Sequence, residues 1–533
     1  MSETTAITRR TACGLAAAAG LSAWAKPAFA NGETLRAQQW GVVDIVLPGP
    51  SDGTPDAKIW LSATFKKSSL FGKDVEHSAL GFYDGSGAYR IRFSPPEPGT
   101  WSYLTRSNNP ALDRSSGKIE AAGPAPGNHG PVRVADSFHF AYADGTPFRP
   151  IGTTSYGWIH QPADIRAQTL QTLAAAPFNK IRMLVFPNGS LTTNEALYPF
   201  MGVPNDWDYD RFNPEFFHRL EDSVAALEKL GIEADIILFH PYDEGRYGFD
   251  ALPDKVNARY IEHLIARLAP YHNVWWSVAN EFDLMHEKTM GDFDHYFEIL
   301  QAHDTYNHLR SIHHMRQFYN NAKPWVTHSS IQSGAIAEDD ERAMLLRDVW
   351  NKPVVLDEVK YEGNYSARWG QLNGKEMTSR FWFGTIAGVY VSHGEFIEDA
   401  AHHMWVGTGG QLRGTSAPRI AFLRKILEAS PRHGLDPIDK WQDHHIAGVA
   451  GKYYLKYFGD AAPKDWTFSL PKAGLEDGDS FTVDILDSWN MTITPVAGKF
   501  TVTAQGAYDF ADQDGRSIAL PGKPWIALRI QKV

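Results

Sequence analysis

Two glutamates stand at the ends of apolar segments that are far apart in the chain. Glu281 comes at the end of the run NVWWSVANEF (273–282), directly after Asn280, and Glu358 lies in the run PVVLDEVKYEG (353–363). If both runs are strands of one barrel, their carboxyl ends meet at the same mouth. Two carboxylates about 5–5.5 Å apart can cleave a glycosidic bond with retention, one as the nucleophile and one as the general acid/base. The alternative is that each glutamate only forms a salt bridge.

Strand-like runs alternate with helical stretches between residues 132 and 435. Two of the helical stretches, PEFFHRLEDSVAALEKLG (214–231) and NARYIEHLIARLAPY (257–271), are amphipathic. Eight such alternations predict an α/β fold, a (β/α)8 TIM barrel. A doubly wound sheet is the alternative, but no GxGxxG motif follows the first strand and no phosphate-binding loop occurs. The strand candidates are 148–158, 179–187, 232–241, 273–282, 309–314, 325–332, 353–363 and 388–396.

Short alternating strands separated by Gly/Pro/Asp turns occupy the regions on both sides of the predicted barrel. They predict an N-terminal antiparallel β-sandwich domain over residues 34–122 and a C-terminal one over residues 440–533. The segment AAGPAPGNHGP (121–131) is rich in proline and glycine and is therefore predicted to be the first linker.

The Asn-Glu pair ending the fourth predicted strand and the Glu ending the seventh resemble the clan A retaining glycoside hydrolases. This resemblance implies that Glu281 is the acid/base, that Glu358 is the nucleophile and that Asn280 binds the substrate 2-hydroxyl. The segment ADGTPFRPIGTTSYGW (143–158) and the barrel after it resemble the apiosidase-like family. The flanking strands look like the N-terminal and C-terminal β-sandwich domains found with such barrels. Together these resemblances cover nearly all of the chain after the N-terminal segment.

Further polar groups at predicted strand ends are candidates for substrate binding. Arg182 on strand 2 matches the clan's arginine near the nucleophile, with a structural ion pair as the alternative. His240 on strand 3 and His328 on strand 6 are predicted to contact the sugar, and packing is the alternative for His240. Asp357 is expected to point away from Glu358, because neighbouring residues of a strand face opposite sides.

Four aromatic residues are predicted to line a sugar-binding cleft, because the C–H faces of sugars stack on aromatic rings. These residues are Trp405 after strand 8, Tyr156 and Trp158 after strand 1, and Tyr361 after strand 7.

The first 30 residues have the pattern of a twin-arginine-type signal peptide. Arg9 and Arg10 precede the apolar run GLAAAAGLSAWA, and Ala28-Phe29-Ala30 is a small-residue cleavage site. We therefore expect a protein exported to the periplasm or secreted. Cys13, the single cysteine, would be removed with the signal, which excludes disulfides and thiolate metal sites from the mature chain.

Charge and motif content narrow the expected partners. A net charge of −11 argues against a nucleic-acid-binding protein, and no later apolar run reaches about 18 residues, so no membrane span is predicted. No cofactor and no catalytic metal are expected. Adjacent histidines such as His313-His314 and His402-His403 face opposite sides of a strand, and neither a His-Glu-x-x-His motif nor a strand-1 His-x-His motif occurs. A structural calcium ion in the sandwiches and the oligomeric state stay open.

These observations favour an exported retaining glycosidase acting on O-glycosidic bonds of plant or bacterial oligo- or polysaccharides. Three alternatives use parts of the same pattern: a non-catalytic carbohydrate-binding protein, a transglycosylase and a metal-dependent barrel hydrolase. The two carboxylates favour the glycosidase over the binding protein, because binding alone has no need of both.

Overall fold

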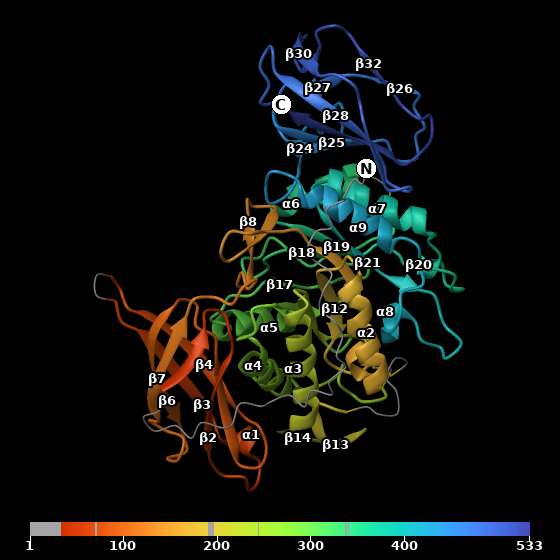
Figure 1. The fold of residues 1–533 in the computed structure, drawn as a ribbon. Coiled ribbons are helices and arrows are strands. Elements are labelled where there is room, and N and C mark those ends of the chain that lie inside the picture. Colours follow the sequence, from red (N-terminus) through yellow and green to blue (C-terminus); the bar gives the residue numbers. More distant parts are fainter. Residues whose placement is uncertain (1–33, 70–71, 190–196, 244, 336–337, 339) are drawn as a thin grey trace, which may run out of the picture.

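The computed structural model describes residues 34–533 apart from 70–71, 190–196, 244, 336–337 and 339. The predicted signal peptide at residues 1–30 lies outside the described residues. A β-domain, a barrel and a second β-domain follow one another along the described chain (Figure 1). The predicted fold class, a TIM barrel flanked by two β-domains, is therefore confirmed.

Seven strands form the N-terminal β-domain, in the sheet order β1-β7-β6-β3-β4-β5-β2. All neighbours are antiparallel except β1 and β7, which run parallel, so the expectation of a purely antiparallel domain fails at this edge. The core contains Phe65 and Phe93, whose rings stack with centroids 3.9 Å apart. The elements are β1 (Thr34–Gln38), β2 (Val43–Pro48), α1 (Pro55–Lys58), β3 (Leu61–Lys67), β4 (Val75–Tyr83), β5 (Ala88–Phe93), β6 (Gly99–Ser107) and β7 (Ser116–Ala122).

Eight parallel strands form the barrel, in sheet order β17-β16-β15-β12-β11-β21-β19-β18. A parallel bridge between His313 and Ser330 joins the two edge strands and closes the barrel. Each strand lies within one of the eight predicted runs. Their bounds are β11 (Ile151–Thr154), β12 (Lys180–Leu184), β15 (Glu233–Phe239), β16 (Val274–Ala279), β17 (Arg310–Ser311), β18 (Ser329–Gln332), β19 (Val354–Glu358) and β21 (Tyr390–His393).

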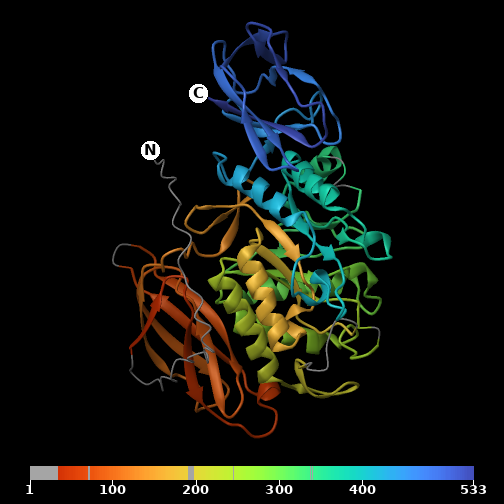
Figure 2. The same ribbon diagram turned by 45° about the vertical axis from the view of Figure 1, so that its right-hand side comes forward.

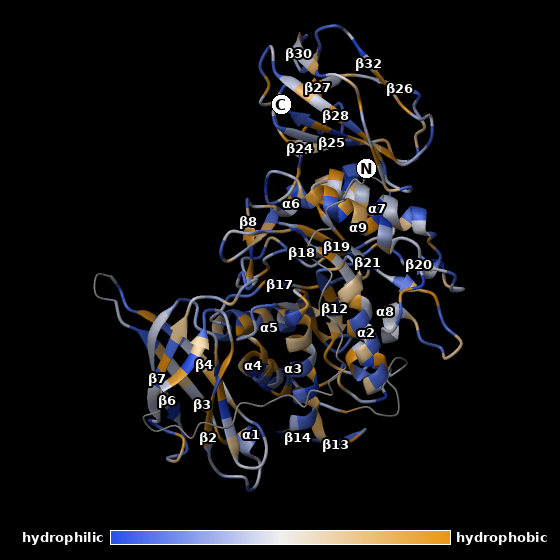
Figure 3. Ribbon diagram, viewed as in Figure 1, coloured by the Kyte–Doolittle hydropathy of each residue, from blue (hydrophilic) through white to orange (hydrophobic). Residues whose placement is uncertain are grey.

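Helices surround the barrel, and α3 illustrates how one of them packs against it. The Asn213 side chain accepts a hydrogen bond from the backbone N–H of Glu215 and Pro214 takes the first helical position, which together define the start of α3. In Figure 3 hydrophilic and hydrophobic patches both occur along α3, and its apolar side is buried. The helices are α2 (Ala163–Ala175), α3 (Pro214–Lys229), α4 (Asp254–Leu268), α5 (Met290–His303), α6 (Asp340–Trp350), α7 (Gly374–Ile386), α8 (Trp405–Thr408) and α9 (Ala417–Glu428), with short 3-10 turns at Trp158–His160, Phe282–Leu284 and Arg368–Gly370.

Within the described ranges, no helix combines the length and the apolar character needed to cross a bilayer.

A small antiparallel sheet closes the N-terminal end of the barrel. Its middle strand carries Phe140, whose ring packs against Trp275 of β16 with centroids 5.2 Å apart. Because this end is plugged by apolar side chains, the opposite end is left for a site. The sheet consists of β8 (Val132–Ala135), β9 (His139–Tyr142) and β10 (Pro147–Phe148). Two further strand pairs follow barrel strands: β13 (Phe200–Val203) with β14 (Asp206–Phe212), and β20 (Glu362–Gly363) with β22 (Glu395–Phe396).

The C-terminal β-domain has a large sheet in the order β23-β24-β25-β33-β28-β30-β31-β27, with β29 paired to β28 and a separate β26-β32 pair. Phe468 and Phe500 stack in its core with centroids 4.6 Å apart. The strands are β23 (Asp436–Pro437), β24 (Ile446–Val449), β25 (Tyr453–Tyr457), β26 (Asp465–Thr467), β27 (Ser469–Pro471), β28 (Ser480–Asp487), β29 (Thr492–Pro495), β30 (Phe500–Gln505), β31 (Asp509–Asp512), β32 (Ser517–Ala519) and β33 (Ile526–Lys532).

The two β-domains lie at different sides of the barrel, the first beside α4 and α5 and the second beside α7 (Figures 1 and 2). Buried charges join the N-terminal domain to the barrel helices. Arg267 of α4 binds Asp84 at 2.9 Å and Glu221 of α3 at 2.7 Å, and Arg92 of β5 binds Glu221 at 3.0 Å. All four side chains are at most 3% exposed. The first domain is therefore fixed to the barrel by a shared ion-pair network.

We predict that Arg267→Met destabilises the protein by about 3–5 kcal/mol, because it leaves two buried carboxylates short of a cation. Chemical denaturation followed by tryptophan fluorescence measures this loss. Arg114→Met is the matched control, since the Arg114 side chain is 78% exposed and exposed ion pairs contribute little. An Arg267→Met protein as stable as the control would contradict the assigned importance of the network.

Candidate active site

Glu281 and Glu358 lie at the carboxyl-end mouth of the barrel, where their strands β16 and β19 end. Glu358 is the last residue of β19, and Glu281 stands two residues after Ala279, the last residue of β16. The backbone of Glu281 has φ 44° and ψ 49°, the left-handed conformation. A non-glycine residue adopts it at a cost of about 1–3 kcal/mol, and such strain concentrates at functional sites. The chain thus turns sharply at the residue that carries one of the two carboxylates.

Several polar side chains surround the carboxylate of Glu358, among them Tyr156, Arg182 and His313. The Tyr156 hydroxyl donates a hydrogen bond to Oε1, the Nη1 of Arg182 lies 3.8 Å from Oε1, and the Nε2 of His313 lies 3.4 Å from it. The Glu358 side chain is only 5% exposed. This carboxylate is therefore held as an anion in a mostly buried position.

The carboxylate of Glu281 has a different set of partners. The Tyr242 hydroxyl donates to its Oε2 at 2.8 Å, and Gln332 supplies a second hydrogen bond. The Nδ2 of Asn280 donates to the same Tyr242 hydroxyl at 2.5 Å. Gln332 Oε1 also lies 3.0 Å from Nε2 of His313, and the same nitrogen of His313 contacts Glu358. Gln332 and His313 together therefore connect Glu281 to Glu358.

These surroundings shift the pKa values of the two glutamates in opposite directions. Burial and the negative charge of Glu358 raise the pKa of Glu281, against the hydrogen bonds from Tyr242 and Gln332. Burial by itself would raise the pKa of Glu358, but the hydrogen bond and charge of His313 and the charge of Arg182 lower it to about 2. The surroundings therefore favour the ionised form of Glu358 and shift Glu281 toward its protonated form, which are the forms needed in a nucleophile and an acid.

A charge network inside the barrel supports the pair. Lys180 binds Asp235 at 2.6 Å and Asp357 at 2.8 Å, and the Nη2 of Arg182 donates to Oδ1 of Asn280 at 2.7 Å. These charged side chains and Asn280 are fully buried. Asp357 is directed into this interior network, in agreement with the expectation that it points away from Glu358. Arg182 lies between Asn280 and Glu358 and offsets the charge of the latter.

Two of the four predicted aromatic contacts belong to the mouth. Tyr156 binds Glu358, and the Tyr361 hydroxyl lies 3.5 Å from that of Tyr156. The other two predictions need correction. Trp405 is 0% exposed and donates its indole N–H to Thr153, while Trp158 is 1% exposed within the barrel core. Neither ring presents a face on which a sugar could stack.

His328 and His240 also need correction as sugar contacts. His328 comes before β18 begins, so it lies at the plugged end of the barrel, with its ring 5.1 Å from Trp275 and 5.8 Å from Phe140. His240 is buried behind the mouth. Its ring stacks on Tyr242 at 5.4 Å and its Nδ1 accepts the backbone N–H of Tyr242. Burial lowers the pKa of His240 to about 4, so a neutral imidazole positions Tyr242.

Three residues of the site are not among the predicted substrate contacts. The sequence places Tyr242 on the loop after strand 3, where it indicates only a residue that shapes the pocket. His313 enters the pattern only as half of a histidine pair, and nothing in the pattern singles out Gln332. His313 and Gln332 stand at the ends of strand candidates 309–314 and 325–332. A comparison of the residues at the ends of the fifth and sixth strand candidates finds both, since Gln332 is the last residue of its candidate and His313 the last but one.

Two groups among the described residues have the donors and spacing to hold a metal ion, and neither contains Glu281 or Glu358. One is Asp340, His444 and His445. The other is Glu362, His393 and Glu395, whose carboxylates already accept backbone N–H groups of residues 413–416.

Three segments of the chain match family models. Residues 135–391 match the model described as "Apiosidase-like, catalytic domain". Residues 36–108 match "Domain of unknown function (DUF5060)", and residues 441–531 match "Domain of unknown function (DUF5605)". No curated protein matches the chain.

Among solved structures, a putative glycoside hydrolase from Bacteroides vulgatus is 39% identical with a TM-score of 0.89, covering 94% of this chain and 100% of its own. A glycoside hydrolase family 5 protein from the same organism is 15% identical with a TM-score of 0.58, covering 76% of this chain and 94% of its own, and supports the fold alone. With the barrel, the paired glutamates and the 39% identical relative together, the chain belongs to the apiosidase-like glycoside hydrolases and is a glycosidase.

Proposed function

We propose that this glycosidase is a retaining enzyme that works by double displacement, with Glu358 as nucleophile and Glu281 as acid/base. The observation that carries the proposal is the placement of two glutamates at one barrel mouth, where Arg182 and His313 lie beside Glu358 and the Tyr242 hydroxyl binds Glu281. These different partners shift the two pKa values in opposite directions. A carboxylate that stays ionised suits attack, and a carboxyl with a raised pKa suits proton donation.

In the first step, an oxygen of Glu358 forms a bond to the anomeric carbon while the bond from that carbon to the leaving oxygen breaks. The proton of Glu281 moves to the leaving oxygen. In the second step, the Glu281 carboxylate takes a proton from water, the water oxygen bonds to the anomeric carbon, and Glu358 leaves as a carboxylate. The two inversions give net retention.

Arg182 and Tyr156 prepare Glu358 for attack in this scheme. Arg182 supplies a positive charge and Tyr156 donates a hydrogen bond, so both stabilise the free carboxylate. Asn280 is proposed to bind the substrate 2-hydroxyl. Its amide is held on one side by Arg182 and on the other by Tyr242, which fixes its orientation before substrate arrives.

The substrate class is proposed to be an uncharged oligo- or polysaccharide of plant or bacterial origin. Tyr156 and Tyr242 are half-buried at the mouth and combine apolar ring surface with a hydroxyl, a pairing that suits sugars. The Bacteroides relative, described as a putative glycoside hydrolase, supports only that the substrate is a carbohydrate.

The site of action is proposed to be outside the cytoplasm, in the periplasm or the medium. This rests on the twin arginines, the apolar run and the Ala28-Phe29-Ala30 site of the first 30 residues.

We predict that Glu358→Ala and Glu281→Ala each lower kcat on an activated aryl glycoside by at least about 1000-fold, while sugar binding persists. Azide distinguishes the roles, since it can occupy the space of the missing carboxylate. With Glu358→Ala it should give a glycosyl azide of inverted configuration, and with Glu281→Ala one of retained configuration. Glu287→Gln, an exposed glutamate six residues after Glu281, is the control and should keep full activity. A Glu358→Ala protein with wild-type turnover would falsify the assignment.

We predict that Tyr242→Phe moves the alkaline limb of the kcat/KM–pH profile to higher pH by about 0.4–1 unit. The Tyr242 hydroxyl stabilises the Glu281 carboxylate and lowers its pKa. Removing a hydrogen bond worth about 0.5–1.5 kcal/mol therefore raises the pKa of Glu281, which must be protonated to act. Tyr508→Phe, on the exposed surface of the C-terminal domain, is the control. A limb that stays in place or moves to lower pH argues against Glu281 as the acid.

A further inference from the structure

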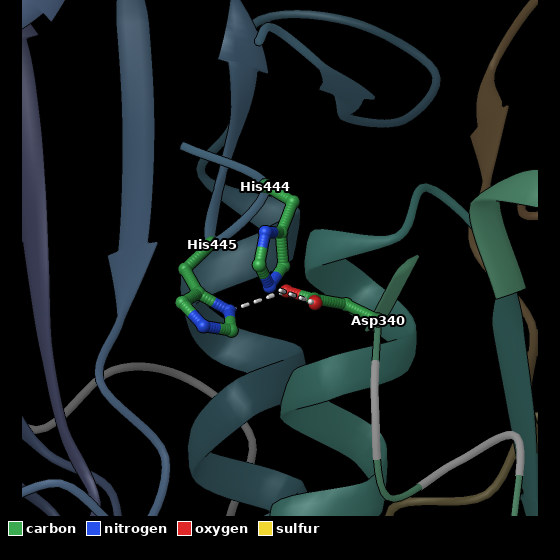
Figure 4. Close-up of side chains that lie close together, drawn as sticks. All are labelled: Asp340, His444 and His445. Carbon is green, nitrogen blue, oxygen red and sulfur yellow. Dashed lines mark hydrogen bonds and ion pairs between the residues drawn. The ribbon is translucent and has the colours of Figure 1, made fainter. Parts of the chain in front are cut away.

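A cluster of one aspartate and two histidines joins the barrel to the C-terminal β-domain. Asp340 is the first residue of α6, and His444 and His445 directly precede β24. Figure 4 shows both imidazole rings beside the Asp340 carboxylate, each with one nitrogen directed at an oxygen. Asp340 lies 104 or more positions before the two adjacent histidines in the chain. Only the docking of the two domains therefore brings the three residues together.

The donor atoms have the spacing of metal ligands. Nδ1 of His445 lies 2.9 Å from Oδ2 of Asp340, and Nε2 of His444 lies 3.5 Å from Oδ1. One donor atom from each residue lies within 4.8 Å of the others. Ligands at about 2.0–2.2 Å from a tetrahedral ion are about 3.4 Å apart, so an ion could enter with displacements of a fraction of an ångström to about one ångström.

Adjacent histidines on a strand would face opposite sides, but these two lie in a turn. The turn at residues 444–445 brings the two rings to the same side, with centroids 4.0 Å apart. This local conformation is what allows consecutive histidines to serve one ion.

The carboxylate of Asp340 is buried, but one of its two oxygens has no hydrogen-bond donor among the described residues. The residue is 0% exposed, and its Oδ1 makes no hydrogen bond to any residue that the structure describes. Burial of a carboxylate oxygen without a partner costs free energy. The two histidines are 35% and 43% exposed, which gives an ion a route from solvent to this oxygen.

We propose that Asp340, His444 and His445 bind a divalent transition-metal ion of the Zn²⁺ class, with water as the fourth ligand. Two imidazole nitrogens and one carboxylate oxygen are a donor set that suits Zn²⁺, whereas Ca²⁺ requires six to eight oxygens. The other metal-like group is less suited, because the Glu362 and Glu395 oxygens already accept backbone hydrogen bonds.

The bound ion would connect α6 of the barrel with the C-terminal β-domain. Neighbouring ion pairs cross the same junction, namely Lys440 with Asp348 at 2.6 Å and Arg347 with Asp436. A metal that holds ligands from both sides favours the docked state by mass action. The site is thus structural and independent of the hydrolytic mechanism proposed above.

Titration of tag-free, chelator-treated full-length protein with Zn²⁺ tests the proposal. We expect one ion per chain by calorimetry, a rise in Tm with added Zn²⁺, and, with Co²⁺ in its place, the visible absorption of a four-coordinate ion. The double variant His444→Ala/His445→Ala and the variant Asp340→Asn should each weaken Zn²⁺ binding at least about 10-fold, since losing even a hydrogen-bond partner of a ligand costs that much. Circular dichroism establishes that both variants are folded.

His433→Ala is the matched control, because His433 pairs with a single carboxylate, Asp136, at 2.8 Å. It should bind Zn²⁺ like the wild type. Binding of less than one ion per chain, or equal binding by the control and the cluster variants, would overturn the proposal and leave the cluster as a set of ion pairs.

Discussion

Buried charges inside the barrel are the constraint on which the site depends. Lys180 is enclosed between Asp235 and Asp357, and these side chains come from β12, β15 and β19. Removing one charge from such a group leaves the others unpaired in a medium that solvates them poorly, which typically costs about 3–5 kcal/mol. The group therefore fixes the register of three strands. It also places Arg182, two residues after Lys180 and on the same side of β12, between Asn280 and Glu358.

The two glutamates differ because their neighbours differ, although both stand at equivalent strand ends. Glu358 has Arg182, His313 and Tyr156 as partners, which favour the ionised form. Glu281 has neutral hydrogen-bond donors and the negative field of Glu358. Tyr242 is central to this difference, since it donates to Glu281 while accepting from Asn280. His240 in turn holds Tyr242 by stacking, so a buried histidine acts on the site through another side chain.

The flanking parts of the chain limit where a site can form. The β8–β10 sheet plugs the N-terminal end of the barrel with Phe140, and the N-terminal domain covers α4 and α5 through the Arg267 network. His328 illustrates the consequence. A histidine four residues before the end of a strand candidate could belong to either end of the barrel, and packing on Trp275 decides that it belongs to the plugged end. Trp405 likewise follows a strand, yet its indole is enclosed by the core.

The sequence alone determined the order of the domains, the eight barrel strands and the glutamates at two strand ends, because hydrophobic periodicity and the position of polar residues after apolar runs are local properties. Tyr156 and Tyr361 also followed from that logic, whereas the roles of Arg182 and Asn280 were implied by the resemblance to the clan A glycoside hydrolases. Tertiary structure alone decided which side chains are covered and which meet, as with His313 and Gln332, or Asp340 and His445. These contacts join residues from separate strands or domains. Their distances depend on strand register, backbone turns such as the one at Glu281, and packing across the whole chain, none of which a local pattern encodes.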